Sequence, residues 1–469
     1  MARVISQWFS SIAGQSERTL LLGAVLVLSA VSGATGFFLA HYYSVDVFSS
    51  LIIFLPADCY LDWGLNVGGH CFSDYAIPAA VGMRPNPWVP YPLYLPPDFK
   101  AMGSLYPAAG MMPQVMFGLL GKFLGAPRIG LLSYLLALTT AVLSPAAWAA
   151  RGARGVERFV VFVSCGVAAV PVWVMIDRGN SVGFAVPIAL VFLVALCRRR
   201  WSLGAVMVVL IALVKPQFAV LVVALFAARK WRLGSVAVAG IAFSNLAAYV
   251  FWPRDFPQTI PQSIRAVLGY GGGSMQAAEV ANSNVSLGKA LLAIPDAIKA
   301  AQTGGKIPDD FLSGARSLIG YAVVLIVVSV VIALGRRIPP VMAGIVLLAT
   351  GSLFPALSNP YYLFFVLPLA ALVVRDPYGP LGTGIFDRPE VVGGRRRAVG
   401  VCVSLAAALC IAQIAIPGPI QEVGGEAYTR SDEKVLVVAS TLSLAPILWL
   451  ITLVVILVSY ARRPAVGVA

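Results

Sequence analysis

The sequence predicts an all-α polytopic membrane protein, and three observations carry this expectation. Apolar residues make up 59% of the chain, and the mean hydropathy is +0.86. Apolar stretches of about 20 residues recur from end to end, and each could cross a ~30 Å hydrocarbon core as a helix. Lysine and arginine gather in short clusters between these stretches, as they do in membrane proteins. Because no segment resembles a separate soluble domain, we expect one transmembrane domain over residues 1–469.

Composition also excludes several classes of function. The net charge of +14 is spread over the inter-span clusters and forms no single basic patch, so no nucleic-acid partner is expected. The six cysteines show no metal-ligand spacing, and the two histidines are isolated, so we expect neither a metal nor a cofactor. Cys59 and Cys71 share one loop and would form a disulfide only in an oxidising compartment.

The basic clusters give a self-consistent topology when all of them are placed inside. Residues 20–42 then form an uncleaved signal anchor, and both termini are cytoplasmic. Two large outer loops follow, at 43–128 and 252–316. The remaining full spans lie near 129–149, 157–176, 181–197, 233–251, 317–335, 339–357, 360–374, 398–416 and 437–460. The clusters are Arg151/Arg154/Arg158, Arg198–Arg200, Arg229/Lys230/Arg232, Arg336/Arg337, Arg395–Arg397 and Arg462/Arg463.

Residues 202–228 break this regular pattern. Lys215-Pro216-Gln217 interrupts the apolar stretch, and each half, about 12 residues long, is too short to cross at 1.5 Å per residue. Both flanks are basic and therefore inside. The segment is predicted to be a broken helical hairpin with its tip near the outer face, in addition to about ten full spans.

Acidic residues favour the predicted outer segments, which contain 15 of the 20. Four of them, Asp46, Asp58, Asp62 and Asp74, follow the first span. A carboxylate beside a bilayer is costly unless water, a partner or a substrate receives it. This bias indicates that the function is carried out on the outer side. The apolar segment 105–124, which contains two prolines, is expected to lie along the outer interface.

Four different segments, taken in their order along the chain, point to one family. The first is Asp58, followed by an aromatic-proline run at 91–97 and by Tyr106-Pro107. The others are Arg178-Gly179-Asn180 opening a span that ends at Arg198–Arg200, Lys215-Pro216 with Arg229-Lys230-Trp231-Arg232, and Asn282-Ser283-Asn284 with Asn359-Pro360-Tyr361-Tyr362. Over residues 40–375 the set resembles the polyprenyl-phosphate-sugar-dependent GT-C glycosyltransferases of family 87, the actinobacterial α-mannosyl- and arabinofuranosyltransferases. This chain departs from the family in two ways: the proline-rich part of the first loop is longer than expected, and the segment around Asp58 matches only loosely, so the base could be Asp62.

The resemblance implies a GT-C-type transmembrane bundle in the plasma membrane, with short interfacial helices in its outer loops. It implies inverting transfer of mannose or arabinofuranose from a polyprenyl-phosphate donor to a cell-envelope glycan or glycolipid. Asp58 or Asp62 would be the general base. Lys215 and Arg178 would hold the donor phosphate. The implied substrate-binding residues are Tyr60, Trp63, Asn180, Gln217, Asn282, Ser283, Asn284, Tyr361 and Tyr362.

Each of these residues also has a structural explanation. Asp58 and Asp62 would solvate a loop start beside an interface anchor, Trp63. Lys215 would extend into water from the hairpin tip. Arg178 would pair with Asp177 or with a lipid headgroup. The remaining alternatives are a loop cap or a glycosylation sequon at Asn284-Val285-Ser286, and interface-belt tyrosines at Tyr361 and Tyr362.

Two other functions fit the same composition. The span count and the lysine in a broken hairpin are compatible with a secondary transporter or lipid flippase for a lipid-linked or anionic substrate. The chain shows no two matching halves, however, and its polar content is concentrated in two outer loops, which suits a substrate bound on one side. A non-catalytic membrane scaffold would leave Lys215 unexplained.

Overall fold

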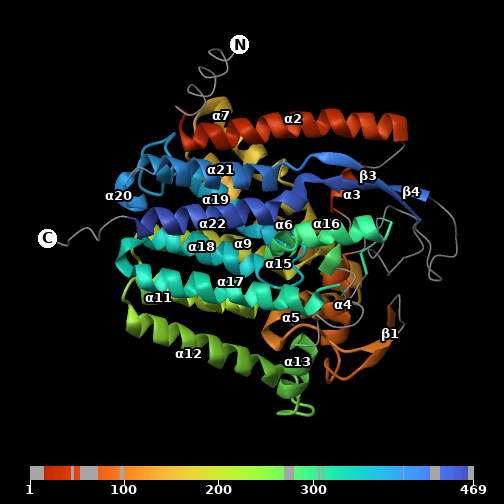
Figure 1. Cartoon of the computed structure of the whole chain (residues 1–469). Coiled ribbons are helices and arrows are strands. Elements are labelled where there is room, and N and C mark those ends of the chain that lie inside the picture. Colours follow the sequence, from red (N-terminus) through yellow and green to blue (C-terminus); the bar gives the residue numbers. More distant parts are fainter. Residues whose placement is uncertain are drawn as a thin grey trace.

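The structure, a computed structural model, is a helical bundle that carries two short antiparallel strand pairs at one end (Figure 1). It describes residues 15–43, 47–52, 72–95, 100–268, 279–281, 283–304, 307–308, 311–394, 396–422 and 434–462. Strand β1 (Tyr91–Leu95) pairs with β2 (Lys100–Met102), and β3 (Ala415–Glu422) pairs with β4 (Lys434–Ser440). We call this the strand end. The arginine end is the opposite one, where α20 (Pro389–Val392) lies.

Among the described residues, five helices are long and apolar enough to cross a membrane. They are α2 (Glu17–Tyr43), α6 (Pro127–Ala150), α12 (Trp231–Ala248) with η4 (Tyr249–Phe251), α17 (Ser313–Leu334) with η7 (Gly335–Arg337), and α22 (Ala445–Ala461) with η10 (Thr441–Leu444). A sixth would be the predicted span 157–176. It consists of α7 (Gly155–Phe162), the π-turn η1 (Val163–Val167) and α8 (Val170–Arg178), and it bends by 48°. A helical membrane protein is confirmed, whereas ten full spans are not.

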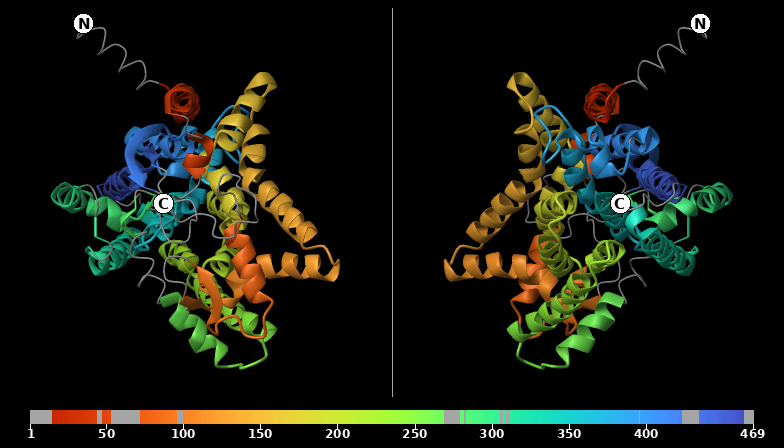
Figure 2. Two further views of the ribbon diagram at one scale, coloured as in Figure 1. Left: turned by 90° about the vertical axis from the view of Figure 1, so that its right-hand side faces the viewer. Right: turned by 90° about the vertical axis from the view of Figure 1, so that its left-hand side faces the viewer.

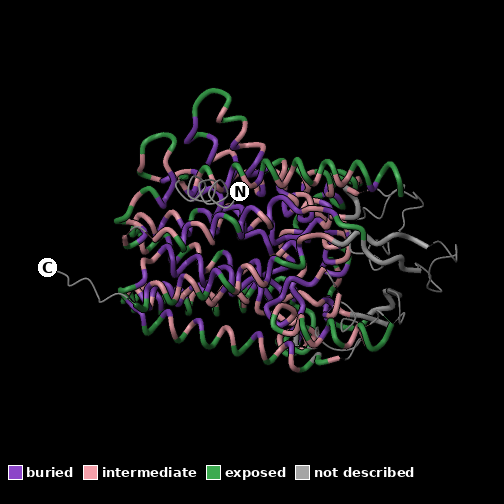
Figure 3. The backbone as a smooth tube through the Cα atoms, turned by 45° about the horizontal axis from the view of Figure 1, so that its top comes forward, coloured by how far each residue is buried: buried purple, intermediate pink, exposed green. Residues whose placement is uncertain are grey.

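The remaining apolar helices are shorter, and several form the centre of the bundle. At 1.5 Å per residue, a helix of about 14 residues reaches only ~20 Å. In α18 every residue after Pro340 is buried, and all of α19 is buried, as expected for helices that are apolar on every face. Figure 3 shows the buried positions concentrated inside the bundle and the exposed ones on its periphery. The shorter apolar helices are η2 (Ser181–Phe184) with α9 (Ala185–Cys197), α10 (Trp201–Val214), η3 (Pro216–Leu221) with α11 (Val222–Ala227), α18 (Pro340–Leu353), η8 (Pro360–Phe365) with α19 (Val366–Val374), and α21 (Arg397–Ile411).

The strands correct the prediction of an all-helical chain. The predicted span 398–416 ends as a helix at Ile411, and β3 follows, with Pro417 and Pro419 in it; proline removes a helical hydrogen bond. The predicted span 437–460 begins as β4, and its helix starts only at Ala445. Hydropathy alone does not separate a short apolar strand from the end of a helix, which explains both errors.

Residues 201–227 turn back on themselves. Helix α10 ends at Val214, and the extended backbone of Lys215 (φ −146°, ψ 113°) suits a residue that precedes proline. A Cβ built on Gly204 would lie 3.9 Å from the Cδ2 of Leu225, so the start of α10 lies beside the end of α11. The two arms are therefore antiparallel, and Lys215 lies at the turn between them.

Short helices connect the spans at the strand end. They are α3 (Val47–Ile52), α4 (Ser73–Gly82), α5 (Ala108–Phe123), α13 (Thr259–Leu268), α15 (Leu287–Leu291) and α16 (Ala293–Gln302). Figure 2 views the bundle along its length, and α5 extends sideways in it. Met116, Leu119 and Phe123 are exposed on α5. Helix α5 covers most of the segment 105–124, whose position along the outer interface stays a prediction.

A buried ionic cluster joins the short helices α15 and α16 to α17. The Arg316 side chain is fully buried and contacts Asp296 through both carboxylate oxygens, with N–O distances of 2.5 and 3.2 Å. Lys289 Nζ lies 2.9 Å from Asp296 Oδ2. Burial alone would raise the pKa of Asp296, but hydrogen bonds from Arg316 and Lys289 outweigh it and hold the pKa below its usual value.

We predict that Asp296→Asn destabilises the protein, because Arg316 would keep a buried charge without its carboxylate. Breaking such a pair costs roughly 3–5 kcal/mol. Thermal unfolding of the purified protein in detergent measures this loss of stability as a lower unfolding temperature. Glu390→Gln is the control, since Glu390 is 77% exposed and meets Arg388 only at 3.9 Å.

The same experiment has a pH dependence. A carboxyl group whose pKa is lowered by folding stabilises above its unfolded pKa, and this contribution is lost as pH falls through the folded value. The difference in unfolding temperature between wild type and Asp296→Asn should therefore shrink below about pH 4. A difference that stays constant down to pH 2–3 would contradict the ionic account.

Candidate functional site

Several predicted site residues lie outside the described part of the chain. These are Asp58, Tyr60, Asp62, Trp63 and Asn282. The proposed disulfide between Cys59 and Cys71 also lies outside it. The general base therefore stays a sequence prediction.

Arg178, Gly179 and Asn180 form the turn between α8 and η2. Arg178 ends α8, and Gly179 follows in the left-handed conformation (φ 64°). A Cβ at Gly179 would lie 2.9 Å from the Cβ of Tyr75, so glycine permits the close approach of α4. The Asn180 Oδ1 accepts a 2.9 Å hydrogen bond from the Val182 N–H, which caps η2.

Asp74, in the first turn of α4, is the carboxylate that contacts Arg178 and Asn180. Arg178 Nε and Nη2 lie 3.2 and 3.4 Å from its two oxygens, and Asn180 Nδ2 donates to Oδ2 at 2.9 Å. The Asp74 carbonyl accepts from Gln114 Nε2 at 3.3 Å. Asp74 is one of the four acidic residues that follow the first span, and its sequence position predicts no specific role for it. Nothing in the sequence indicates that α4 brings it to a turn about a hundred residues away.

Lys215 is a buried cation beside this group. Its relative exposure is 9%, and its ammonium lies 4.1 Å from the centroid of the Tyr106 ring and 5.9 Å from that of Tyr362. Within the described ranges, no carboxylate or carbonyl contacts this ammonium. Two aromatic faces offset part of the cost of removing a full charge from water. The tip of the hairpin is therefore covered by protein and does not extend freely into solvent.

Tyr106 links the two halves of the cluster. Its hydroxyl lies 3.5 Å from Asn180 Nδ2, while its ring covers Lys215. Asp74 is close enough for its charge to act on Lys215. The structure thus assembles two cations, one carboxylate, an amide and an aromatic wall, which we call the Lys215 cluster (Asp74, Tyr106, Arg178, Asn180 and Lys215). Cations of this kind hold phosphate oxygens. The Asn180 amide is fully buried, and its donors and its acceptor oxygen are used within the protein.

Asn284 and Gln217 are engaged within the protein. The Asn284 amide donates to the carbonyls of Glu279 and Ala356 and accepts from the N–H groups of Ser286 and Ser358, at 2.8–3.0 Å. Since both donors and the acceptor oxygen are used, Asn284 holds the loop against the turn after α18 and has no free group for a sugar. Gln217 Nε2 donates to the Gly351 carbonyl at 2.8 Å.

The other predicted substrate contacts have different positions. Tyr362 faces Lys215, and its ring lies 4.9 Å from that of Tyr361. Tyr361 is 4% exposed, and its hydroxyl accepts from Asn359 at 2.8 Å. Ser283 is half-buried beside Asn284. Tyr362 is therefore one of the rings that face Lys215, whereas Tyr361 is a buried neighbour of Tyr362.

An apolar groove of about 580 Å³ approaches the Lys215 cluster between α5, α9, α10 and α12. Val214, the residue before Lys215, lines it, so the groove reaches the hairpin turn. Met116, Phe243 and Phe251, which also line it, are 62–75% exposed, so the groove is open to the protein exterior. Its other lining residues are Ala109, Met112, Pro113, Phe117, Phe184, Ile188, Leu210, Leu213, Ser244, Ala247 and Ala248.

The described segments hold no group of three or more histidine, cysteine or acidic side chains able to bind a metal ion. Comparison of the sequence with protein-family models and with curated proteins found no match.

We predict that Asp74 and Arg178 are energetically coupled. Asp74→Asn and Arg178→Gln should each lower the free energy of unfolding. The decrease in the double variant should be smaller than the sum of the two single decreases by about 1–2 kcal/mol. Chemical unfolding in detergent measures all four proteins. Arg178→Gln combined with Glu390→Gln, at the arginine end, should be additive. Additivity of the Asp74–Arg178 pair would contradict the coupling.

Proposed function

We propose that this chain is an integral-membrane, inverting glycosyltransferase that takes a sugar from a polyprenyl-phosphate donor. The observation that carries the proposal is the pairing of a buried ammonium, Lys215, with an apolar groove that is lined by the preceding residue, Val214. A polyprenyl phosphate has the matching parts, namely a long apolar tail and an anion at its end. The acceptor would be a cell-envelope glycan or glycolipid.

The donor phosphate would lie at Lys215, with Arg178 contributing from the neighbouring turn. Between two aromatic rings the ammonium is poorly hydrated, so its attraction for an anion is stronger than in water. The same cations would stabilise the charge that develops as the sugar–phosphate bond breaks. Asp74 is already bonded to Arg178 and Asn180, which suits a residue that positions these groups rather than one that accepts a proton.

Proton removal from the acceptor hydroxyl is assigned to Asp58, with Asp62 as the second choice. The hydroxyl oxygen would attack the anomeric carbon while the carboxylate takes its proton and the lipid phosphate leaves with the bonding electrons. A single displacement of this kind inverts the anomeric centre, so a β-linked donor gives an α-linked product. The donor class and the inverting outcome rest on the family resemblance.

The strand end would face outside, and the arginine end would face the cytoplasm. Arg198, Arg375 and Arg396 hold carbonyls of loops or helix ends at the arginine end. Helices α4 and α5 lie towards the other end (Figure 1), and α4 carries Asp74 of the Lys215 cluster. This separation of charge supports a plasma-membrane enzyme with its site on the outer side.

We predict that Lys215→Met lowers kcat/KM for a polyprenyl-phosphate sugar by about a hundredfold, because the phosphate loses its buried cation. Purified protein, donor and an acceptor glycolipid are incubated, and the acceptor's mass increment is measured. Lys230→Met is the matched control, since Lys230 also lies over an aromatic ring (Trp201, 5.4 Å) but near the arginine end. Equal loss in both variants would contradict the assignment.

The same assay separates enzyme from transporter and locates the base. Asp58→Asn should abolish the mass increment while donor binding stays intact, and retained activity would move the base to Asp62. A transporter or flippase would use the groove and Lys215 as well, but it would move the donor across vesicles without forming a glycosidic bond. Movement without any increment would overturn the proposed function.

The groove makes a further prediction about chain length. Ala247→Trp would fill the groove and should raise KM for long-chain donors about tenfold or more, with little effect on donors of one or two prenyl units. Ala242→Trp is the control, because Ala242 is an exposed residue of the same helix that does not line the groove. A loss that is independent of chain length would argue that the tail lies elsewhere.

A further inference from the structure

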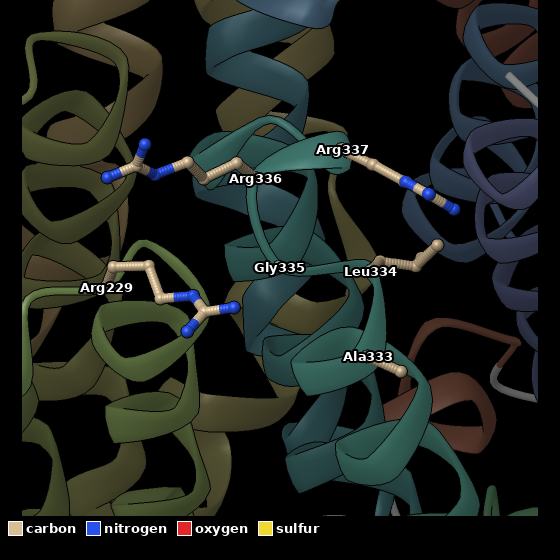
Figure 4. A pocket seen from close by; sticks show the side chains of 6 residues that line it. All are labelled: Arg229, Ala333, Leu334, Gly335, Arg336 and Arg337. Carbon is tan, nitrogen blue, oxygen red and sulfur yellow. The ribbon is translucent and has the colours of Figure 1, made fainter. Parts of the chain in front are cut away.

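A second pocket, of about 610 Å³, lies at the arginine end and has no part in the proposed transfer reaction. It is lined by Arg229, Ala333, Leu334, Gly335, Arg336 and Arg337 (Figure 4). Arg229 extends towards Gly335, and Arg336 extends towards the segment that carries Arg229, whereas Arg337 points to the other side. Two segments about a hundred residues apart in the sequence thus bring arginines to one pocket.

The local backbone structure does not require the guanidinium group of Arg229. Arg229 follows α11 in the left-handed conformation (φ 59°). The N–H groups of Arg229 and Lys230 donate to the carbonyls of Phe226 and Leu225 at 2.9 Å, which closes the helix end. Since the backbone satisfies those carbonyls, the Arg229 side chain is free for another role.

Three other arginines at this end have carboxylate partners, and the pocket's arginines differ from these three. Arg18 contacts Glu157 at 2.5 Å, Arg397 contacts Glu17 at 2.8 Å, and Arg388 contacts Asp376 at 3.2 Å. Within the described residues, no carboxylate pairs with Arg229, Arg336 or Arg337. Like charges that share a pocket repel one another unless an anion lies between them.

The pocket lies at the depth where candidate spans end. The span Gly314–Arg337 finishes in it, and the span Trp231–Phe251 begins two residues after Arg229. Trp231 is 53% exposed and packs on Phe226 with ring centroids 5.4 Å apart. Tryptophan of this kind is enriched at the headgroup level of membranes. The anion available at that level is the phosphate of a phospholipid.

We propose that Arg229 and Arg336, with Arg337 at the rim, form a binding site for a phosphate group, supplied by the headgroup of an anionic phospholipid. The planar guanidinium fork matches phosphate oxygens in pairs, which favours arginine over lysine for this task. Basic pockets between spans on the cytoplasmic side are suited to such headgroups. A bound headgroup would also tie α11, the second arm of the Lys215 hairpin, to the end of α17.

The test measures binding of cardiolipin to the full-length detergent-solubilised chain by native mass spectrometry, with phosphatidylcholine as the neutral reference. Arg229→Gln/Arg336→Gln should weaken cardiolipin binding about tenfold or more. Arg199→Gln/Arg200→Gln is the matched control. Arg199 also closes a helix in the left-handed conformation (φ 51°) and is exposed, but neither residue lines the pocket.

The outcomes separate the site from general attraction between opposite charges. Loss in the pocket variant with unchanged binding in the control supports the proposal. Equal loss in both variants, or no loss in either, overturns it. A second arm titrates inorganic pyrophosphate and follows thermal stability; stabilisation that requires Arg229 and Arg336 without lipid would keep the phosphate site and assign it to a soluble anion.

Discussion

A charged ammonium held beneath the protein surface is the constraint on which the rest of the site depends. Lys215 interrupts an apolar stretch, and a buried cation is costly unless an anion or a polarised surface meets it. Two features of the fold surround this charge. The chain turns back at Lys215-Pro216, and the rings of Tyr106 and Tyr362 lie beside the ammonium. Around this point lie Asp74, Arg178 and an apolar groove that Val214 lines. An amphiphilic phosphate would satisfy the cation and the groove together.

The sequence was informative where a local rule controls the backbone. Proline after Lys215 ends α10, and the basic residues at both flanks of 202–228 predict that the chain returns to the side from which it came. The turn at Arg178-Gly179-Asn180 is likewise local, since it needs a left-handed residue and a capping amide. By contrast, the partner of Arg178 is Asp74, which lies 104 positions away. A single sequence contains no signal for that contact.

Hydropathy was less informative about the ends of the chain's spans. It counts apolar residues but does not distinguish a crossing helix from a short buried one such as α18, or from a strand such as β4. Asn284 shows a related difficulty, because an Asn-Ser-Asn motif suits sugar hydroxyls and loop anchoring equally well. Its four hydrogen bonds within the protein make it an anchor, which tertiary structure alone reveals.

A structure of the protein with a polyprenyl-phosphate sugar bound in a bilayer mimetic would test the central claim most directly. The account predicts the donor phosphate within hydrogen-bonding distance, about 2.7–3.2 Å, of Lys215 Nζ. It also predicts the prenyl tail between α5, α10 and α12, and the sugar on the side of α4 and the first loop. A donor bound with its phosphate away from Lys215, for example at the arginine end, would contradict the account.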